Sequence, residues 1–331
     1  MAQHFLITGA TGFVGGHLAE ACAARGHSVS TIARPASDTL LLERAGVTIH
    51  RGDLTDPQAV RRALDGVDVV VHCAAKVGDR GPVEEYRAIN VDGTRHLLQA
   101  CRDRPLRRFI HMSTLGVYQA RHHYGTDETE PLPARHIDGY TQTKVEAEHV
   151  VMDYYRKHQL PVVILRPGFV YGPRDRTVLP ELIKRLAAGQ VHYLGGERRA
   201  LNTIYVGNLV DAVFLAVDKP RAVGQAFNLT DGEHVTKRRF FEAVADSLGL
   251  PKPHQQLPRW FAALAVLFLR WEARWAKLIG KKPWLSPAEH KFLLLNLDFS
   301  IEKARRELGY RPRFTFDQAM RETMAWYRQN A

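Results

Sequence analysis

Cysteine is scarce in this chain, and apolar runs long enough to span a membrane are absent. The three cysteines, Cys22, Cys73 and Cys101, form neither a Cys-x-x-Cys pair nor a Cys/His cluster, which argues against a disulfide framework and favours a reducing compartment. The apolar run 260–269 has half of the roughly 20 residues that a membrane-spanning helix needs. The N-terminus lacks the basic and apolar regions of a secretory signal, so we expect a cytoplasmic protein.

Acidic residues are also in deficit. The chain has 46 Lys and Arg against 35 Asp and Glu, a formal net charge of +11. Such a surplus suits nucleic acid, an anionic membrane surface or an anionic cofactor. Because no folded nucleic-acid-binding motif is present, we predict no nucleic-acid partner. The adjacent His122 and His123 lack converging ligands, and we predict no metal site.

Short apolar runs alternate with helical patterns through the first half of the chain. We expect strands at Phe5–Thr8, Ser28–Ile32, Val47–His50, Val67–Cys73, Arg108–Met112 and Val162–Leu165. Between them we expect helices at Gly15–Arg25, Pro57–Leu64, Val83–Asp103 and Gly139–His158. This alternation predicts an α/β fold, a Rossmann-type doubly wound parallel sheet with helices on both faces.

After Pro173 the pattern loosens. We expect a helix near Leu179–Ala188, a strand pair around Val191–Tyr205, a helix from Asn208 and a strand at Ala226–Leu229. We therefore predict a dinucleotide-binding domain of residues 1–173, to which 202–230 return, and a smaller, discontinuous substrate lobe of residues 174–201 and 231–331.

A glycine-rich turn follows the first expected strand. The sequence Thr8-Gly9-Ala10-Thr11-Gly12-Phe13-Val14-Gly15 has the spacing G-x-x-G-x-x-G at the start of a helix. Glycines allow the tight turn and a close approach of backbone to phosphate, and the helix N-terminus supplies free amides. We predict that a dinucleotide pyrophosphate contacts Gly9, Thr11, Gly12, Phe13, Val14 and Gly15.

The end of the second strand distinguishes between the two nicotinamide dinucleotides. An acidic residue there would bind the ribose hydroxyls of NAD, but the sequence reads Thr31-Ile32-Ala33-Arg34. An arginine suits the 2′-phosphate of NADP, so we predict NADP rather than NAD. Asp53 follows the third strand and is placed to accept a hydrogen bond from the adenine amino group, beside Leu54.

Tyr140 and Lys144 lie four residues apart, on one face of an expected helix. A phenol is a poor acid–base catalyst at neutral pH, and a neighbouring cation lowers its pKa. Open α/β sheets bind their ligands at the carboxyl ends of the strands, where the fifth strand offers two hydroxyls, Ser113 and Thr114.

These motifs together resemble the extended short-chain dehydrogenase/reductases of the NAD-dependent epimerase/dehydratase superfamily. The resemblance rests on the glycine turn, Ser113-Thr114-Leu115-Gly116-Val117-Tyr118, Tyr140-x-x-x-Lys144, His72-Cys73-Ala74-Ala75, Asn90-Val91-Asp92-Gly93-Thr94 and Leu165-Arg166-Pro167-Gly168-Phe169-Val170-Tyr171-Gly172-Pro173. It covers residues 1–230 well and the region of Tyr310-Arg311-Pro312 loosely.

The resemblance implies hydride transfer between nicotinamide C4 and a carbinol or carbonyl carbon. Tyr140 would exchange the proton on the substrate oxygen, Lys144 would tune Tyr140 and bind the nicotinamide ribose, and Thr114 would hydrogen-bond that oxygen. It also implies cofactor contacts at Ala74, Ala75, Asn90, Pro167, Gly168 and Val170. Expected substrate contacts are Ser113, Tyr118, Phe169, Leu179 and Asn202.

Three functions are compatible with these motifs. Leu115 stands where dehydratases of this type usually carry an acid, and Tyr205-Val206-Gly207-Asn208 is similar to the 3β-hydroxysteroid and sterol dehydrogenase branch. We predict an oxidoreductase that interconverts a secondary alcohol and a ketone on a hydrophobic, steroid-like substrate. A nucleotide-sugar epimerase or reductase with the same triad is the alternative, in which Arg198 or Arg199 would hold the nucleotide. A noncatalytic cofactor-binding regulatory protein is the third.

The segment 257–279 combines its apolar run with an amphipathic continuation. Basic residues and tryptophans border it over 259–284, which suits either a helix lying in a bilayer interface or a helix packed on the substrate lobe or a partner subunit. We therefore expect possible peripheral membrane contact through 259–284. The family resemblance further implies a homodimer formed through the helices that contain Asn90 and Tyr140.

Overall fold

The computed structural model describes residues 2–78, 81–176, 178–191, 193, 196–253 and 287–330, with backbone only for 287–290. The segment 257–279 and the whole expected membrane contact region 259–284 lie outside the described residues. Among the helices that are described, none is long and apolar enough to cross a membrane.

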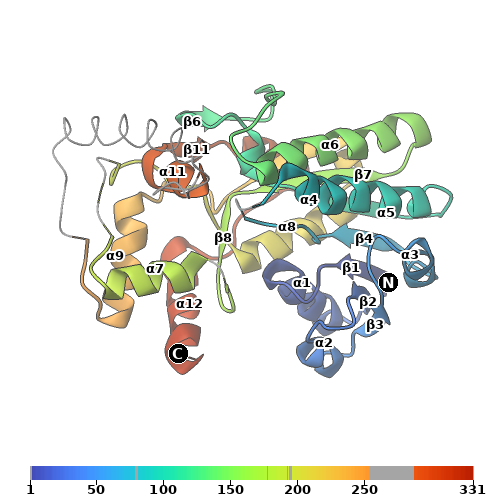
Figure 1. The fold of residues 1–331 in the computed structure, drawn as a ribbon, viewed down its shortest axis with the longest axis horizontal. Coiled ribbons are helices and arrows are strands. Elements are labelled where there is room, and N and C mark those ends of the chain that lie inside the picture. Colours follow the sequence, from blue (N-terminus) through green and yellow to red (C-terminus); the bar gives the residue numbers. More distant parts are fainter. Residues whose placement is uncertain are drawn as a thin grey trace.

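A seven-stranded parallel sheet forms the larger part of the molecule (Figure 1). Its order is β10-β7-β5-β4-β1-β2-β3, so that the first three strands run to one edge and the later ones to the other. The strands are β1 (His4–Thr8), β2 (Ser28–Ala33), β3 (Thr48–Arg51), β4 (Val69–His72), β5 (Arg108–Met112), β7 (Val162–Pro167) and β10 (Gln225–Leu229). This confirms the predicted doubly wound α/β fold.

Both faces of the sheet are buried because successive side chains of each strand point to opposite sides. Phe5 and Ile7 of β1 pack in one core with α1 and α8, whereas Leu6 packs in another with α3, α5 and α6. The helices of this part are α1 (Phe13–Ala24), α2 (Leu40–Arg44), α3 (Pro57–Ala63), α4 (Val83–Arg87), α5 (Gly93–Cys101), α6 (Gly139–His158) and α8 (Val206–Asp218). Short 3-10 turns lie at η2 (Leu115–Val117) and η3 (Pro220–Ala222).

A second group of helices lies at the carboxyl side of the chain and carries a separate apolar core (Figure 1). It contains α7 (Val178–Ala187), α9 (Lys237–Leu248), α11 (Pro287–Leu294) and α12 (Phe316–Asn330), and the π-turn η4 (Ala304–Leu308) packs near β10. Two small parallel sheets join it to the first part, β8 (Phe169–Tyr171) with β9 (Thr203–Tyr205) and β6 (His123–Thr126) with β11 (Leu297–Phe299).

Two local predictions need correction. The expected helix Val83–Asp103 is divided by the π-turn η1 (Ala88–Asp92), where the backbone carries an extra residue per turn around the buried Asn90. The expected strand pair around Val191–Tyr205 is reduced to β9, which pairs with β8 instead of with a neighbour in sequence. Gly168, directly before β8, has no side chain and lets the backbone there approach the backbone of Asn202, directly before β9.

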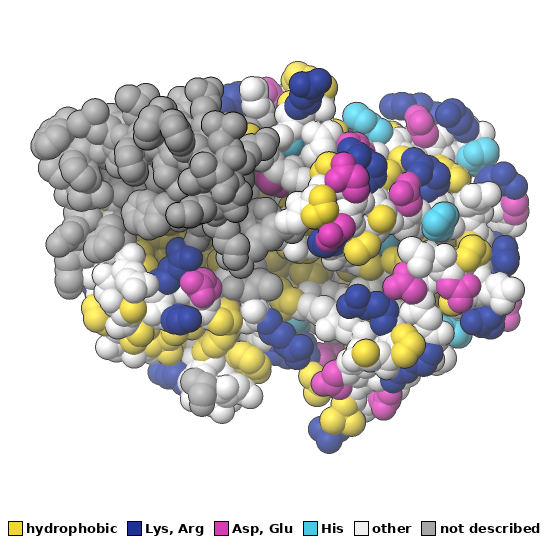
Figure 2. Space-filling model, in the orientation of Figure 1, with side chains coloured by type: hydrophobic (Ala, Val, Ile, Leu, Met, Phe, Trp, Pro, Cys, Tyr) yellow, Lys and Arg dark blue, Asp and Glu magenta, His cyan; other side chains and the backbone are white. Residues whose placement is uncertain are grey.

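Basic residues do not gather in one patch on the face shown in Figure 2. Lys and Arg side chains are interspersed with acidic ones over the sheet part of the molecule. The charge surplus of the sequence is therefore distributed on this face, and its local effects depend on individual side chains such as those described next.

Candidate active site

The glycine turn between β1 and α1 is shaped for a close ligand. Gly9 has φ +73°, and a Cβ there would lie 2.7 Å from the amide nitrogen of Ala74. A Cβ on Gly15 would lie 2.4 Å from the carbonyl oxygen of Gly9. Gly12 caps α1 without a side-chain hydrogen bond, so the first amides of the helix are left for an anion. This cradle fits the pyrophosphate of a dinucleotide.

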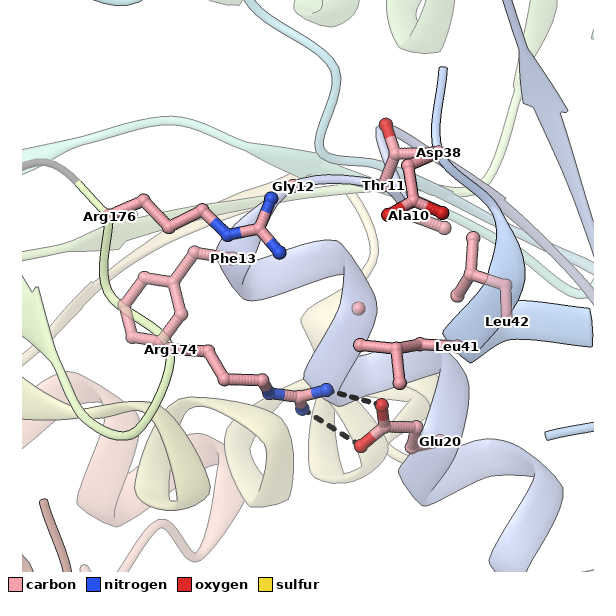
Figure 3. Close-up of a pocket in the computed structure, with 11 residues that line it drawn as sticks. Ala10, Thr11, Gly12, Phe13, Glu20, Asp38, Leu41, Leu42, Arg174 and Arg176 are labelled. Atoms are coloured by element: carbon pink, nitrogen blue, oxygen red, sulfur yellow. Dashed lines mark hydrogen bonds and ion pairs between the residues drawn. The ribbon is translucent and has the colours of Figure 1, made fainter. Parts of the chain in front are cut away.

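A pocket of about 490 Å³, its open mouth included, lies over this turn (Figure 3). It is lined by Ala10, Thr11, Gly12, Phe13, Gly16, Glu20, Asp38, Leu41, Leu42, Arg174 and Arg176. Arg174 is held by two hydrogen bonds to Glu20, of 2.5 and 2.8 Å. Asp38, Arg174 and Arg176 were not predicted from the sequence, although Arg174 directly follows the Gly172-Pro173 pair and Arg176 lies two residues further on.

The residues expected at the adenosine end lie at the surface. Arg34 is exposed directly after β2, and its carbonyl oxygen accepts hydrogen bonds from the Ser37 amide and from Arg51. Asp53 is exposed, and its Oδ1 accepts two hydrogen bonds of 2.9 Å from Thr55. Leu54 is half-buried against the core beneath β2 and α3.

The side chain of Asn90 makes its hydrogen bonds within the protein. It is buried, and its side chain accepts a 2.8 Å hydrogen bond from the Lys76 amide and donates to the Lys76 carbonyl and to Thr143 Oγ1. It thereby ties the segment after β4, which includes the half-buried Ala74 and Ala75, to helix α6. The structure thus gives Asn90 a positioning contact.

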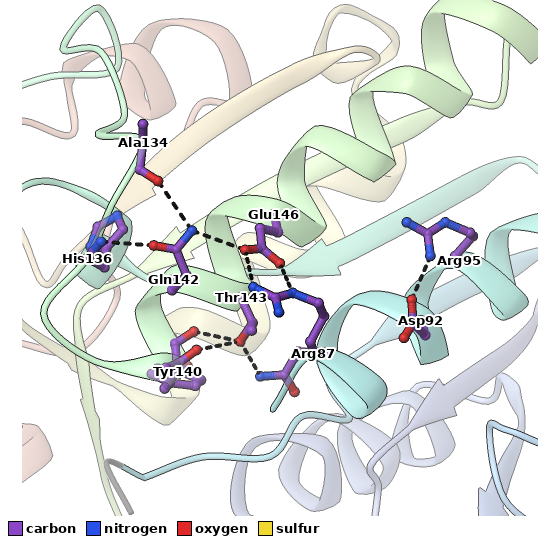
Figure 4. A network of polar contacts seen from close by, with 11 residues as sticks. Arg87, Asp92, Arg95, Ala134, His136, Tyr140, Gln142, Thr143 and Glu146 are labelled. Atoms are coloured by element: carbon purple, nitrogen blue, oxygen red, sulfur yellow. Dashed lines mark hydrogen bonds and ion pairs between the residues drawn. The ribbon is translucent and has the colours of Figure 1, made fainter. Parts of the chain in front are cut away.

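Tyr140 lies in the first turn of α6 (Figure 4). The carboxylate of Asp138 caps this helix. The phenol is half-buried, and burial, followed by the charge of Asp138, raises its pKa to about 12. Burial and Asp138 thus dominate in the protein alone, and the effect of Lys144 on this pKa stays a prediction.

Lys144 is buried one turn further along α6. Its Nζ donates a 2.6 Å hydrogen bond to the carbonyl of Met112, at the end of β5, and lies 3.3 Å from His111 Nε2. Burial lowers the pKa of this lysine to about 8. Since an ammonium has three donors, one donor remains for a further partner.

Thr114 follows β5 and is half-buried. Its Oγ1 accepts a 3.1 Å hydrogen bond from the Gly116 amide, which leaves its hydroxyl proton available. The preceding Ser113 is buried and donates to Glu148 Oε1 over 2.5 Å. Thr114 is thus the hydroxyl that can donate to a substrate, whereas Ser113 is occupied.

A buried polar network stands behind these groups. Glu148 and Arg166 form an ion pair of 2.6 Å with side chains 3% and 8% exposed. Arg166 also donates to Tyr118 Oη over 2.8 Å, and Tyr118 donates to Asn228 Oδ1 over 2.9 Å. The sequence analysis missed Glu148, although its position four residues after Lys144 places it on the same face of the helix.

The expected substrate residues divide into two groups. Ser113 and Tyr118 belong to the buried network, and Leu179 is completely buried in the core of the second group of helices, so none of the three presents its side chain to a ligand. Phe169 is half-buried and packs edge-on against Phe240 and Phe292.

Backbone contacts join β8 to the segment before β9. The Phe169 amide donates to the Asn202 carbonyl over 2.6 Å, and a Cβ on Gly168 would lie 1.9 Å from that oxygen. Asn202 is half-buried, as is Val170, while Pro167 is buried at the end of β7. These residues form the side of the site that faces the second group of helices.

Comparisons with known proteins agree with this geometry. A model of the "NAD dependent epimerase/dehydratase family" matches residues 5–230. A 3 beta-hydroxysteroid dehydrogenase/Delta 5-->4-isomerase of Mycobacterium tuberculosis (strain ATCC 25618 / H37Rv) is 33% identical over 97% of this chain and 90% of its own. A 2-alkyl-3-oxoalkanoate reductase of Stenotrophomonas maltophilia (strain K279a) is 32% identical over 97% of this chain and 98% of its own. The crystal structure of gox2253 superposes with a TM-score of 0.81 at 29% identity, over 99% of each chain.

Proposed function

The chain belongs to the NAD-dependent epimerase/dehydratase family, and from that premise we propose that it is an NADP(H)-dependent oxidoreductase that interconverts a secondary alcohol and a ketone on a hydrophobic, steroid-like substrate. As a member of this family with relatives that are dehydrogenases and reductases, it is an enzyme that uses a nicotinamide dinucleotide. The observation that carries the proposal is the arrangement of Tyr140 and Lys144 on α6 with Thr114 at the carboxyl end of β5.

In the proposed mechanism the bound dinucleotide supplies or accepts the hydride. Tyr140 transfers the proton to or from the substrate oxygen, and Thr114 donates a hydrogen bond to that oxygen as negative charge develops. Lys144, anchored on Met112, directs its remaining donor toward the nicotinamide ribose. A phenol whose pKa is about 12 is protonated at neutral pH, so in the protein alone Tyr140 is in the form that can donate a proton to a carbonyl oxygen.

The cofactor contacts are proposed from the cradle outward. The amides of the first turn of α1, directly after Gly12, bind the pyrophosphate. Ala74 and Ala75 flank the adenosine, and Pro167, Gly168 and Val170 border the nicotinamide. Arg34 carries the preference for NADP, and Asp38 in the nearby pocket opposes it, since its carboxylate would repel a 2′-phosphate. Substitution of each side chain separately measures its contribution to the affinity for NADPH.

A hydrophobic substrate is supported by two independent features. Phe169, directly after Gly168, packs edge-on against Phe292, directly after Lys291, and the relatives include a hydroxysteroid dehydrogenase and an oxoalkanoate reductase. The nucleotide-sugar alternative loses support because Arg199, a candidate for holding the nucleotide, instead donates to the Leu294 carbonyl. We retain Phe169 and Asn202 as proposed substrate contacts.

The remaining proposals concern organisation. We propose the division into a dinucleotide-binding domain of 1–173 with 202–230, and a substrate lobe of 174–201 and 231–331; the membership of β10 in the large sheet supports it. A homodimer through the helices of Asn90 and Tyr140, and membrane contact through 259–284, remain proposals as well.

Turnover with a small panel of substrates tests the function. Absorbance of NADPH and NADH is followed with a 3β-hydroxysteroid such as pregnenolone and with a 2-alkyl-3-oxoalkanoate. Conversion of UDP-glucose is followed by separation of the sugar products, because epimerisation causes no net change in the cofactor. We expect activity with one of the apolar substrates, and Tyr140→Phe should lower turnover by about two to four orders of magnitude while the affinity for NADPH is kept. Turnover of UDP-glucose alone, or a normal rate in the Phe variant, would contradict the proposal.

A further inference from the structure

The cap of the catalytic helix is shared with a distant part of the chain. Asp138 Oδ1 accepts hydrogen bonds from the amide and hydroxyl of Thr141, of 2.7 and 2.9 Å. Its other oxygen, Oδ2, accepts a 2.8 Å hydrogen bond from Lys291 Nζ. The two side chains of this ion pair are 5% and 15% exposed, so the pair is largely removed from water.

Lys291 belongs to a helix that is held firmly on the second group of helices. Its helix, α11, ends at Leu294, whose carbonyl accepts from Arg199, and the following Leu295 carbonyl accepts a 2.6 Å hydrogen bond from the buried Lys237. Asn296 then binds the Ala200 amide over 2.8 Å. The ammonium of Lys291 is therefore brought to α6 by an anchored element and not by a free surface side chain.

We propose that Lys291 is a positioning residue for the reaction: its ion pair with Asp138 neutralises the acidic cap beside Tyr140 and holds the start of α6 against α11. This inference rests on the proposed role of Tyr140 and adds a residue from the opposite side of the site. It makes the proton affinity of the phenol depend on an element of the substrate lobe.

Electrostatics supports the proposal. Burial comes first, but the negative charge of Asp138 is the second cause that raises the pKa of Tyr140. The ammonium of Lys291, in turn, lowers the pKa of Asp138 against the effect of burial, so this carboxylate is charged at neutral pH. A lone carboxylate at the cap would disfavour the phenolate, and the paired cation offsets that effect.

Other titratable groups surround the phenol and stay unchanged in the test. Those at or near the start of α6 are Lys144 one turn along the helix, His136 in the loop before it, Tyr86 of α4 beside Gly139, and His111 of β5 in contact with Lys144. Burial lowers the pKa values of His136 and His111, so both are neutral in the range where a phenol titrates.

Direct titration of the phenol tests the inference without any substrate. The full chain is labelled with 3-fluorotyrosine, which titrates at lower pH than tyrosine, and the ¹⁹F resonance of Tyr140, one of 11 tyrosines, is identified by its loss in Tyr140→Phe. We compare Lys291→Met, Asp138→Asn and the double variant. Asparagine keeps an oxygen for the Thr141 amide and therefore preserves the cap.

The two single variants break the same ion pair but should move the titration in opposite directions. Lys291→Met leaves the acid alone and should raise the midpoint by roughly half to one pH unit, Asp138→Asn leaves the cation alone and should lower it by a similar amount, and the double variant should return close to the wild type. Lys252→Met, which breaks the exposed pair with Asp246 on α9, is the control and should change nothing.

Shifts of the same sign in both single variants, or none, would overturn the inference, because a purely structural contact predicts no dependence on which charge is removed. Lys291→Gln replaces Lys291→Met if thermal unfolding shows that the Met variant is not folded. A normal turnover in Tyr140→Phe would instead remove the proposed role of Tyr140, so the two failures are distinguishable.

Discussion

The ion pair between Glu148 and Arg166 permits a sharp prediction about what holds the active site together. Glu148→Gln removes the negative charge but keeps the size of the side chain, and it leaves the guanidinium of Arg166 buried without a counter-ion. Ser113, which donates to Glu148 over 2.5 Å, loses a charged acceptor at the same time. Both changes occur directly behind Thr114 and Lys144.

The magnitude follows from burial. With side chains only 3% and 8% exposed, removal of one partner should cost about 3–5 kcal/mol in the free energy of unfolding. The matched control is Glu146→Gln, two residues earlier on the same helix. Glu146 binds Arg87 over 2.8 Å, but these side chains are 26% and 41% exposed, so that change should cost at most about 1 kcal/mol (Figure 4).

Urea unfolding of the three proteins, followed by circular dichroism, measures these free energies. A difference below about 1 kcal/mol between the two variants would refute the reasoning, because burial would then not determine the cost. The double variant Glu148→Leu/Arg166→Met should recover part of the loss, since no unpaired charge remains in it.

The pH dependence of cofactor binding offers a second measurement on the same variant. Burial lowers the pKa of Lys144 to about 8, and Glu148 is the largest influence that opposes this decrease. Affinity for NADPH should therefore fall as the pH rises through about 8, when Lys144 loses its charge. In Glu148→Gln the fall should begin at lower pH, and an unchanged profile would exclude electrostatic coupling between the two residues.

Two further predictions concern side chains at the ends of strands. Thr114→Val should lower turnover by about two orders of magnitude with little change in stability. Ser113→Ala should mainly lower the free energy of unfolding. If kinetics and melting show the reverse pattern, Ser113 is the catalytic hydroxyl instead. Arg34→Ala should weaken binding of NADPH by roughly tenfold to a hundredfold and leave the affinity for NADH unchanged in fluorescence titration. Asp38→Asn should strengthen binding of NADPH. Equal losses of affinity for both cofactors in Arg34→Ala would show that this arginine does not bind the 2′-phosphate.

Local periodicity explains which parts of the molecule were predictable. The six expected strands of the first half all occur in the central sheet, because a parallel strand buried on both faces reads as an apolar run whatever packs against it. The turn Gly9–Gly15 was equally predictable from the sequence. Its glycines are required because the backbone packs closely against the turn itself and against the segment that follows the neighbouring strand β4.

The alternation of side chains along a strand distinguishes Ser113 from Thr114. Successive side chains at the end of a strand point to opposite faces, so both hydroxyls could not face the same ligand. The structure buries Ser113 against Glu148 and leaves Thr114 half-buried beside Gly116. Alternation could therefore have excluded Ser113 from the substrate contacts before any coordinates were known.

The ion pairs that support the site could not be read from the sequence in this way. Glu148 and Arg166 are separated by 18 positions, and Asp138 and Lys291 by 153. No local sequence pattern connects two charged residues over such separations. The positions of Arg174 and Arg176 likewise depend on how the chain passes from the central sheet to the second group of helices. Surface and buried charges look alike in a sequence, because burial is a property of the assembled fold.

Helix α6 is where these long-range contacts converge, and each acts on a different part of the proposed chemistry. Its N-terminal cap contacts α11 through Asp138, next to the phenol of Tyr140. Its next turns contact β5 and β7 through Lys144 and Glu148. A change in the second group of helices should therefore reach the proton-transfer step through the cap, whereas a change in the sheet should act on cofactor binding and stability.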